Sequence, residues 1–211
     1  MIVDAFGLKH VVDKSASFIV EEAYEPFMKD VLKRLDKGDV FVDVGAHVGK
    51  YSFYASRLVG DSGLVIAIEP HPKNMKNLKK GIRLNGLSNV VTVQKACSNY
   101  RGRGFLKEDT LSAKHELAQK TTKLTVDVDT LDNILHTVRI KKVSTVKIDV
   151  NRYEYQVLQG TRKTLSEFKP QLIVEVNFGN KRKISEYLNK WNYKPATLSE
   201  TKRYFDLFFC T

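Results

Sequence analysis

Two acidic residues flank a glycine-containing loop: Asp43 lies near the end of one predicted strand, and Glu69 directly follows the next. The strand Val40–Val44 is β-branched and aromatic, as expected for a strand buried on both faces, and Gly45 and Gly49 frame the turn after it. Glu69 follows Gly49 by twenty residues, about the spacing at which a ribose-binding carboxylate follows the glycine loop of a βαβ unit. One carboxylate can accept hydrogen bonds from both ribose hydroxyls. The spacing therefore predicts a site for a nucleoside cofactor.

The loop itself distinguishes between the cofactors that such a site could bind. It reads DVGAHVG over residues 43–49 and lacks the Gly-x-Gly-x-x-Gly spacing with which a helix N-terminus holds a pyrophosphate. The acidic Asp43 would repel phosphate but suits a ligand with an amino group and a sulfonium, which favours S-adenosylmethionine (SAM) over NAD. The alternative is an ordinary strand-turn-helix with Asp43 as helix cap. The candidate cofactor-binding residues are Asp43, Gly45, Ala46, His47, Gly49, Ser52, Glu69, Pro70, Ala96, Cys97 and Asp149.

Composition limits the class of protein. The 211 residues are 42% hydrophobic and 28% charged, values typical of one soluble globular domain over residues 1–211. No apolar stretch approaches the ~20 residues of a membrane span and the N-terminus lacks a signal-peptide core, so we expect a cytoplasmic protein without a membrane partner. The two cysteines, Cys97 and Cys210, and the spacing of the other residues indicate no metal site. The net charge of +11 would attract nucleic acid, but the cations are scattered along the chain, so we do not favour that partner.

Strands and helices alternate along the chain, which predicts an α/β fold with a mostly parallel sheet. Residues 1–37 are expected to form a helical cover, with a helix that has Pro26 in its first turn. Tyr24 and Glu25, just before this helix, could reach the ligand, or Tyr24 could serve only for packing. Residues 99–128 are expected to be an insertion with a mobile loop, Leu111–Thr122. Other strands are expected at 64–68, 90–95, 104–108, 123–128, 145–150, 171–176, 193–198 and 204–210, and other helices at 50–58, 72–85, 130–138, 152–168 and 184–191.

This order of elements is that of the Rossmann-like SAM-dependent methyltransferases, and at finer grain the sequence resembles the FkbM family. The resemblance rests on GDVFVDVGAHVGKYSFYAS at 38–56, VIAIEPHPKNMKNLKKGIRLNGLSNV at 65–90, VKIDV at 146–150, EYQVLQG at 154–160 and PQLIVEVN at 170–177. It implies a seven-stranded sheet, mostly parallel with a C-terminal antiparallel hairpin, and helices on both faces. It also implies transfer of a methyl group from SAM to a hydroxyl of a small molecule or glycan. In that reading Asp43, Gly45 and Gly49 form the SAM loop, Glu69 holds the ribose, and Asp149 lies beside the methyl group.

Two acidic residues at strand ends, Asp149 and Glu175, are the candidate catalytic bases for a hydroxyl acceptor. Alternatively, Asp149 only binds SAM and Glu175 only caps a helix. The sequence departs from the family where Glu-Gly is usual, because it has Asn151 and Arg152 there. This change removes a carboxylate, and Arg152 could instead bind an anionic acceptor. The net charge keeps an RNA methyltransferase as an alternative, and the missing Glu-Gly pair keeps a SAM-binding protein without catalysis as another.

Overall fold

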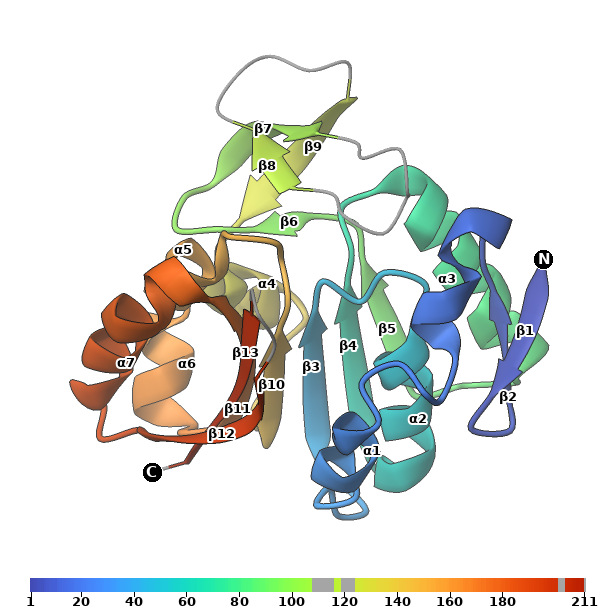
Figure 1. Ribbon diagram of the computed structural model, residues 1–211, viewed down its shortest axis with the longest axis horizontal. Helices are drawn as coiled ribbons and strands as arrows, with labels where there is room; N and C mark the ends of the chain where they lie inside the picture. Colours follow the sequence, from blue (N-terminus) through green and yellow to red (C-terminus); the bar gives the residue numbers. More distant parts are fainter. Residues whose placement is uncertain (108–115, 119–123, 201–203, 211) are drawn as a thin grey trace.

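A seven-stranded sheet forms the centre of the computed structural model, which describes residues 1–107, 116–118, 124–200 and 204–210 (Figure 1). Its strand order is β12-β13-β11-β10-β3-β4-β5. The five strands from β11 to β5 are parallel, whereas β13 runs antiparallel to both β11 and β12. The predicted Rossmann-like sheet with a C-terminal hairpin is therefore confirmed. The strands are β3 (Val40–Val44), β4 (Leu64–Ile68), β5 (Val90–Val93), β10 (Thr145–Ile148), β11 (Gln171–Asn177), β12 (Lys194–Glu200) and β13 (Tyr204–Cys210).

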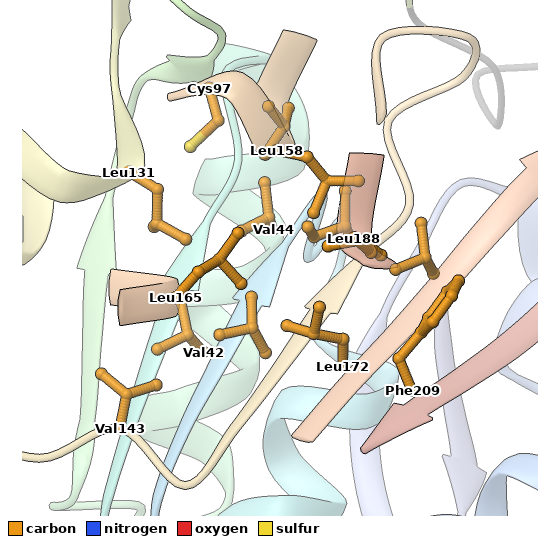
Figure 2. Packing of buried hydrophobic residues seen from close by; sticks show 14 of the residues in the cluster. Val42, Val44, Cys97, Leu131, Val143, Leu158, Leu165, Leu172, Leu188 and Phe209 are labelled. Atoms are coloured by element: carbon orange, nitrogen blue, oxygen red, sulfur yellow. The ribbon is translucent and has the colours of Figure 1, made fainter. Parts of the chain in front are cut away.

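Helices cover both faces of this sheet because alternate residues of its strands point to opposite sides. Val42 and Val44 of β3 pack with α4 (Leu131–Thr137), α5 (Glu154–Gln159), α6 (Arg162–Glu167) and α7 (Lys181–Asn189), as Figure 2 shows in part. Phe41 of β3 packs on the other face, against α1 (Phe27–Leu32) and α2 (Lys50–Val59). On that same face Ala67 of β4 packs with α3 (Pro72–Leu84). The two apolar faces hold the carboxyl ends of the central strands in fixed positions.

The N-terminal segment differs from the expected helical cover. It begins with an antiparallel hairpin of β1 (Ile2–Ala5) and β2 (Leu8–Val11), followed by the 3₁₀ helix η1 (Lys14–Val20) and the short α1. The hairpin turn is made by Phe6 and Gly7, which both have positive φ angles, as a two-residue turn of type I′ requires. Leu8 and His10 are buried whereas Lys9 is exposed, so β2 has the period of a half-buried strand. The expected helix next to Pro26 is present as α1, but the hairpin and the 3₁₀ helix before it were not predicted.

A second, smaller sheet with the order β6-β9-β7-β8 lies beyond the carboxyl ends of the central strands (Figure 1). It consists of β6 (Ala96–Cys97), β7 (Gly102–Lys107), β8 (Glu116–Ala118) and β9 (Leu124–Asp129). The predicted strands at 104–108 and 123–128 correspond to β7 and β9. The predicted mobile loop, Leu111–Thr122, lies outside the described residues, except for the three that form β8.

The predicted helix from Arg152 to Phe168 is two helices, α5 and α6, separated at Gly160 and Thr161. A Cβ atom on Gly160 would lie 2.1 Å from the carbonyl oxygen of Ser98, so this position packs directly against the backbone after β6. Within the described ranges, none of the helices combines the length and the apolar character that crossing a lipid bilayer demands.

Candidate functional site

A cavity opens where β3, β4 and β10 end at their carboxyl edge, with about 1000 Å³ of empty space that continues into solvent. Parallel α/β sheets bind their ligands at this edge. Nine of the residues proposed from the sequence line this cavity: Asp43, Gly45, Ala46, His47, Glu69, Pro70, Ala96, Cys97 and Asp149. Residues from distant parts of the chain therefore meet at one site.

Gly45 allows the loop after β3 to touch the end of β10. Its φ is +87°, and a Cβ atom there would lie 1.9 Å from the carbonyl oxygen of Asp149. Gly49 has a different role, because it precedes α2 with a φ of +90° and its Cβ would lie 2.5 Å from the Phe53 ring. The first glycine shapes the cavity, whereas the second packs helix α2 against the loop.

Asp43 has a buried carboxylate with one oxygen that accepts no hydrogen bond from any described residue. The residue is 1% exposed; Oδ2 accepts a hydrogen bond from Ser52 Oγ at 2.6 Å, and Oδ1 is without such a donor. Burial raises the pKa of Asp43, and the nearby Lys147 opposes this effect. Ser52 does not line the cavity but holds Asp43 from behind. The Oδ1 atom is therefore available to a ligand that brings a positive charge or a donor.

Glu69 connects the loops after β3 and β4. Its Oε2 accepts the backbone N–H of His47 at 2.9 Å, and its Oε1 accepts the backbone N–H of His71 at 2.9 Å and Asn74 Nδ2 at 3.4 Å. Burial raises the pKa of Glu69, and the two backbone donors act in the opposite direction. A carboxylate has about four acceptor positions, so three donors leave capacity for a ligand hydroxyl.

Asp149 and Lys147 form an ion pair in the wall of the cavity. Lys147 Nζ lies 3.0 Å from Asp149 Oδ2 and 3.9 Å from Asp43 Oδ1, and Lys147 is 5% exposed. Burial alone would lower the pKa of Lys147, but the carboxylates of Asp149, Asp43 and Glu25 outweigh it and raise the pKa. The lysine is therefore a fixed positive charge between two of the predicted ligand-binding carboxylates.

The model of the methyltransferase FkbM domain matches residues 43–195, which is more than half of the chain. The chain belongs to the FkbM methyltransferase family. This establishes the family that the sequence motifs had suggested, and the matched range contains every residue of the predicted cofactor loop.

Solved structures with this fold include other methyltransferases. The FkbM methyltransferase from Methylobacillus flagellatus KT superposes with a TM-score of 0.63 at 18% identity, over 96% of this chain and 56% of that one. Trm5b from Pyrococcus abyssi gives 0.58 at 17% identity, over 99% and 54%. M. jannaschii TYW2, solved in complex with AdoMet, gives 0.56 at 16% identity, over 100% and 84%. The chain thus spans little more than half the length of the first two, and the likenesses show a common fold. No curated protein sequence matches this chain significantly.

The N-terminal segment of this FkbM domain supplies a carboxylate to the cavity. Tyr24 and Glu25 both line it, and Tyr51 Oη donates a hydrogen bond of 2.5 Å to Glu25 Oε2. Burial raises the pKa of Glu25, and the charge of Asp149 adds to this effect. Glu25 has a φ of +53°, a conformation that non-glycine residues seldom adopt. The ligand alternative for Tyr24 and Glu25 therefore has geometric support.

Lys50 fastens this segment to helix α2. Its Nζ donates to the carbonyl oxygens of Glu21, at 2.9 Å, and Tyr24. The same ammonium lies within 6 Å of the centres of three rings, those of Phe6, Tyr24 and Tyr51. Burial lowers the pKa of Lys50 to about 8. Lys50 was not identified from the sequence. Its position directly after the glycine loop was the only signal there, because the two carbonyls that it binds lie 26 and 29 residues away.

Glu175, a predicted catalytic base, does not line the cavity. It lies on β11 opposite Asp206 of β13 and is partly buried. Burial raises the pKa of Glu175, and the nearby charges of Asp149 and Glu25 add to this rise. The residue thus belongs to a group of carboxylates next to the cavity, and a direct contact with an acceptor has no support in the geometry.

Arg152, the predicted acceptor-binding residue, is exposed and also does not line the cavity, whereas Asn151 and Tyr153 do. Asn151 and Arg152 have φ angles of +50° and +77°. The backbone N–H of Arg152 donates to Glu154 Oε1 at 2.9 Å. Two consecutive left-handed residues turn the chain before α5 begins, so the guanidinium does not occupy the position expected from a regular helix start.

The cations of the cavity wall are already held by partners. Besides Lys147 and Lys50, Lys95 lines the cavity and its Nζ lies 2.7 Å from Asp129 Oδ2. In the ranges that the structure describes, no group of histidine, cysteine and acidic residues has the arrangement of a metal site. The site is therefore one of carboxylates, paired lysines and tyrosines.

Proposed function

We propose that this FkbM domain binds SAM in the cavity and transfers its methyl group to a neutral hydroxyl of a small molecule or glycan. The residues fit the cofactor in three respects. Asp43 Oδ1, which accepts no hydrogen bond from the described residues, suits the cationic amino-acid portion. The remaining acceptor capacity of Glu69 suits ribose hydroxyls, and Gly45 leaves room for a ligand to approach the backbone. When bound, SAM supplies an electrophilic methyl group.

One observation favours a neutral acceptor over an anionic one, namely that the lysines of the cavity wall are already paired. An anionic acceptor would require a cation that is free to bind it. Lys147 is held by Asp149 and Asp43, Lys95 by Asp129, and Lys50 by two backbone carbonyls. The exposed Arg152 lies away from this wall. The cavity wall thus has few cations that could bind an anionic acceptor, whereas its carboxylate oxygens can accept a hydrogen bond from a neutral hydroxyl.

Glu25 and Asp149 have different roles towards the acceptor in this proposal. One oxygen of Asp149 is engaged by Lys147, which suits a group that orients a ligand by accepting a hydrogen bond. Glu25 has a neutral partner, the Tyr51 hydroxyl, and a raised pKa, which suits a group that takes up the acceptor proton. Glu25 would then provide the carboxylate that the family has in place of Asn151. Most of the acceleration would come from alignment of the two reacting groups.

A two-part experiment tests the proposal. Calorimetry with S-adenosylhomocysteine (SAH) measures cofactor binding, and incubation with methyl-labelled SAM and fractionated cell extract identifies the acceptor. We expect tight SAH binding and label in a neutral, hydroxyl-bearing fraction. Absence of SAH binding would refute the cofactor assignment. SAH binding with no label in any fraction would instead favour a SAM-binding protein without turnover.

A nucleic-acid hydroxyl is the second candidate acceptor, since a ribose hydroxyl is also neutral. One observation favours it, namely the concentration of exposed cations on helix α3 that follows directly from Glu69 and Pro70. Label in the RNA fraction would select this alternative.

A further inference from the structure

Helix α3 carries five exposed cations and no acidic residue along its 13 positions. At about 100° per residue, the five fall within an arc of about 120°. The opposite arc holds the buried residues Asn74, Met75, Leu78 and Gly81, which pack the helix onto the domain. The cationic face consists of Lys73, Lys76, Lys79, Lys80 and Arg83.

The cations of this face are not balanced by neighbouring acids. Among the described residues, only Asp13 makes an ion pair with the face, at 2.6 Å from Lys73 Nζ. Two other helices differ, because Arg182 of α7 pairs with Glu186 and Lys163 of α6 with Glu167, each one turn away.

Within α3 the neighbours one turn apart are instead like charges. Lys76 precedes Lys79 and Lys80 by three and four residues, and Arg83 follows these two lysines by the same spacings. Such pairs destabilise a helix, so the arrangement does not serve the fold.

We propose that the cationic face of α3 binds the phosphodiester backbone of a nucleic acid. A row of basic residues along one helix is the electrostatic feature by which such partners are recognised. From Lys73 to Arg83 the face extends about 15 Å along the helix axis, long enough to contact several phosphates. A lipid surface fits less well, because membrane-binding helices bury large apolar side chains and here only Leu84, at 42% exposure, is of that kind.

The position of the face connects it to the cavity. Helix α3 starts at Pro72, three residues after Glu69, and both Glu69 and Pro70 line the cavity. In Figure 1 α3 lies beside the N-terminal hairpin at one side of the large sheet. A strand bound along α3 would thus lead towards the cavity opening. The inference goes beyond the proposed function, since it concerns docking and holds whichever hydroxyl is methylated.

Fluorescence anisotropy with a single-stranded RNA of about 20 nucleotides, and with DNA of the same sequence, tests the proposal. The variant Lys76→Gln/Lys80→Gln removes two charges from the face. The variant Lys141→Gln/Lys190→Gln removes two exposed charges elsewhere and serves as the control. Both changes are at exposed positions, and thermal unfolding monitored by circular dichroism verifies that each variant folds.

We expect the α3 variant to bind RNA at least tenfold more weakly at about 0.1 M salt, and its slope of log K against log salt to fall in magnitude by about 1.4. The control should change affinity less than twofold. Equal effects of both variants would overturn the proposal, because binding would then depend on total charge. Absence of binding by the unmodified protein, or binding to phosphatidylserine vesicles in place of both nucleic acids, would overturn it as well. A preference for RNA or DNA identifies which backbone the face takes.

Discussion

Lys147 and Asp149 lie two residues apart at the end of β10 and form an ion pair of 3.0 Å in the cavity wall. The same ammonium is 3.9 Å from Asp43, which is 1% exposed. A buried carboxylate is tolerated when a counter-charge is close, and the lysine supplies that charge to both acids. Lys147 thus keeps two ligand-facing carboxylates in place, Asp43 on β3 and Asp149 directly after β10.

Replacement of Lys147 by Met should destabilise the protein by about 3 kcal/mol, because it leaves Asp43 buried without its cation. Urea unfolding at pH 7 measures the change. Lys142→Met is the matched control, since Lys142 also pairs with an aspartate, Asp39, at 2.9 Å but is 61% exposed. Exposed pairs contribute less than about 1 kcal/mol. Equal losses in the two variants would contradict a stabilising role for the buried pair.

Replacement of Glu69 by Gln should weaken SAH binding at least tenfold. The amide nitrogen of Gln cannot accept a hydrogen bond, so it would face a backbone N–H of His47 or His71 and leave fewer acceptors for the ribose. Calorimetry measures the affinity. Asn74→Ser is the comparison on the same wall of the cavity, because it removes the long 3.4 Å contact to Glu69 and leaves both carboxylate oxygens in place, so the loss of affinity should be less than threefold.

A 2′-deoxy analogue of SAH separates the ribose contact from a general effect on the loops. The unmodified protein should prefer SAH over the analogue, and Glu69→Gln should lose most of this preference. If the variant kept both its affinity and its preference, the ribose would not be bound by Glu69.

Spacing along the chain predicted the part of the site that lies within one βαβ unit. Gly45 and Glu69 belong to one βαβ unit, so their separation along the chain determines their positions in space. Glu25 was named from the sequence only as a residue that could reach the ligand, and Lys50 was not identified, because the positions of both arise from packing of the N-terminal segment against α2. Arg152 shows a third case, in which two left-handed residues before α5 redirect a side chain that a regular helix start would have placed at the site.

Two features of the fold were also missed for physical reasons. The strands of the hairpin at residues 2–11 are too short to show a clear alternation of apolar and polar residues. Their burial depends on contacts with α3, more than sixty residues away. The break between α5 and α6 depends on the approach of Gly160 to the backbone of Ser98, which is not a property of the helix sequence. In contrast, the strongly apolar strands β3, β4, β10 and β11 could be predicted directly.

His10 should make the protein less stable in mild acid. It is fully buried and stacks on Phe53, with ring centres 5.0 Å apart. Burial lowers the pKa of His10 from 6.5 to about 4, and the Ala5 carbonyl and Asp4 oppose this only in part. Below pH 6.5 the unfolded chain binds a proton that the folded chain does not, so stability decreases as pH falls towards 4. The loss attributable to His10 at pH 5 is about 2 kcal/mol.

Urea unfolding at pH 7 and pH 5 tests this prediction. The variant His10→Phe should lose about 2 kcal/mol less between the two pH values than the unmodified protein. His136→Gln, which changes an exposed histidine, should keep the full dependence. A pH dependence that is unchanged in His10→Phe would mean that other groups cause the acid sensitivity.

Replacement of Glu25 by Gln should slow methyl transfer by about 10²-fold or more and leave SAH affinity within threefold. Gln keeps the size of the side chain and can still accept the Tyr51 hydroxyl hydrogen bond, but it cannot take up a proton. Because the pKa of Glu25 is raised, the rate in the unmodified protein should increase with pH as Glu25 loses its proton, and this increase should be absent from the variant. Label transfer from SAM to the acceptor fraction and calorimetry with SAH supply the two measurements.

Glu21→Gln is the control on the same segment, since Glu21 is exposed and does not line the cavity, and it should leave the rate unchanged. A parallel loss of rate and SAH affinity in Glu25→Gln would instead make Glu25 a cofactor-binding residue.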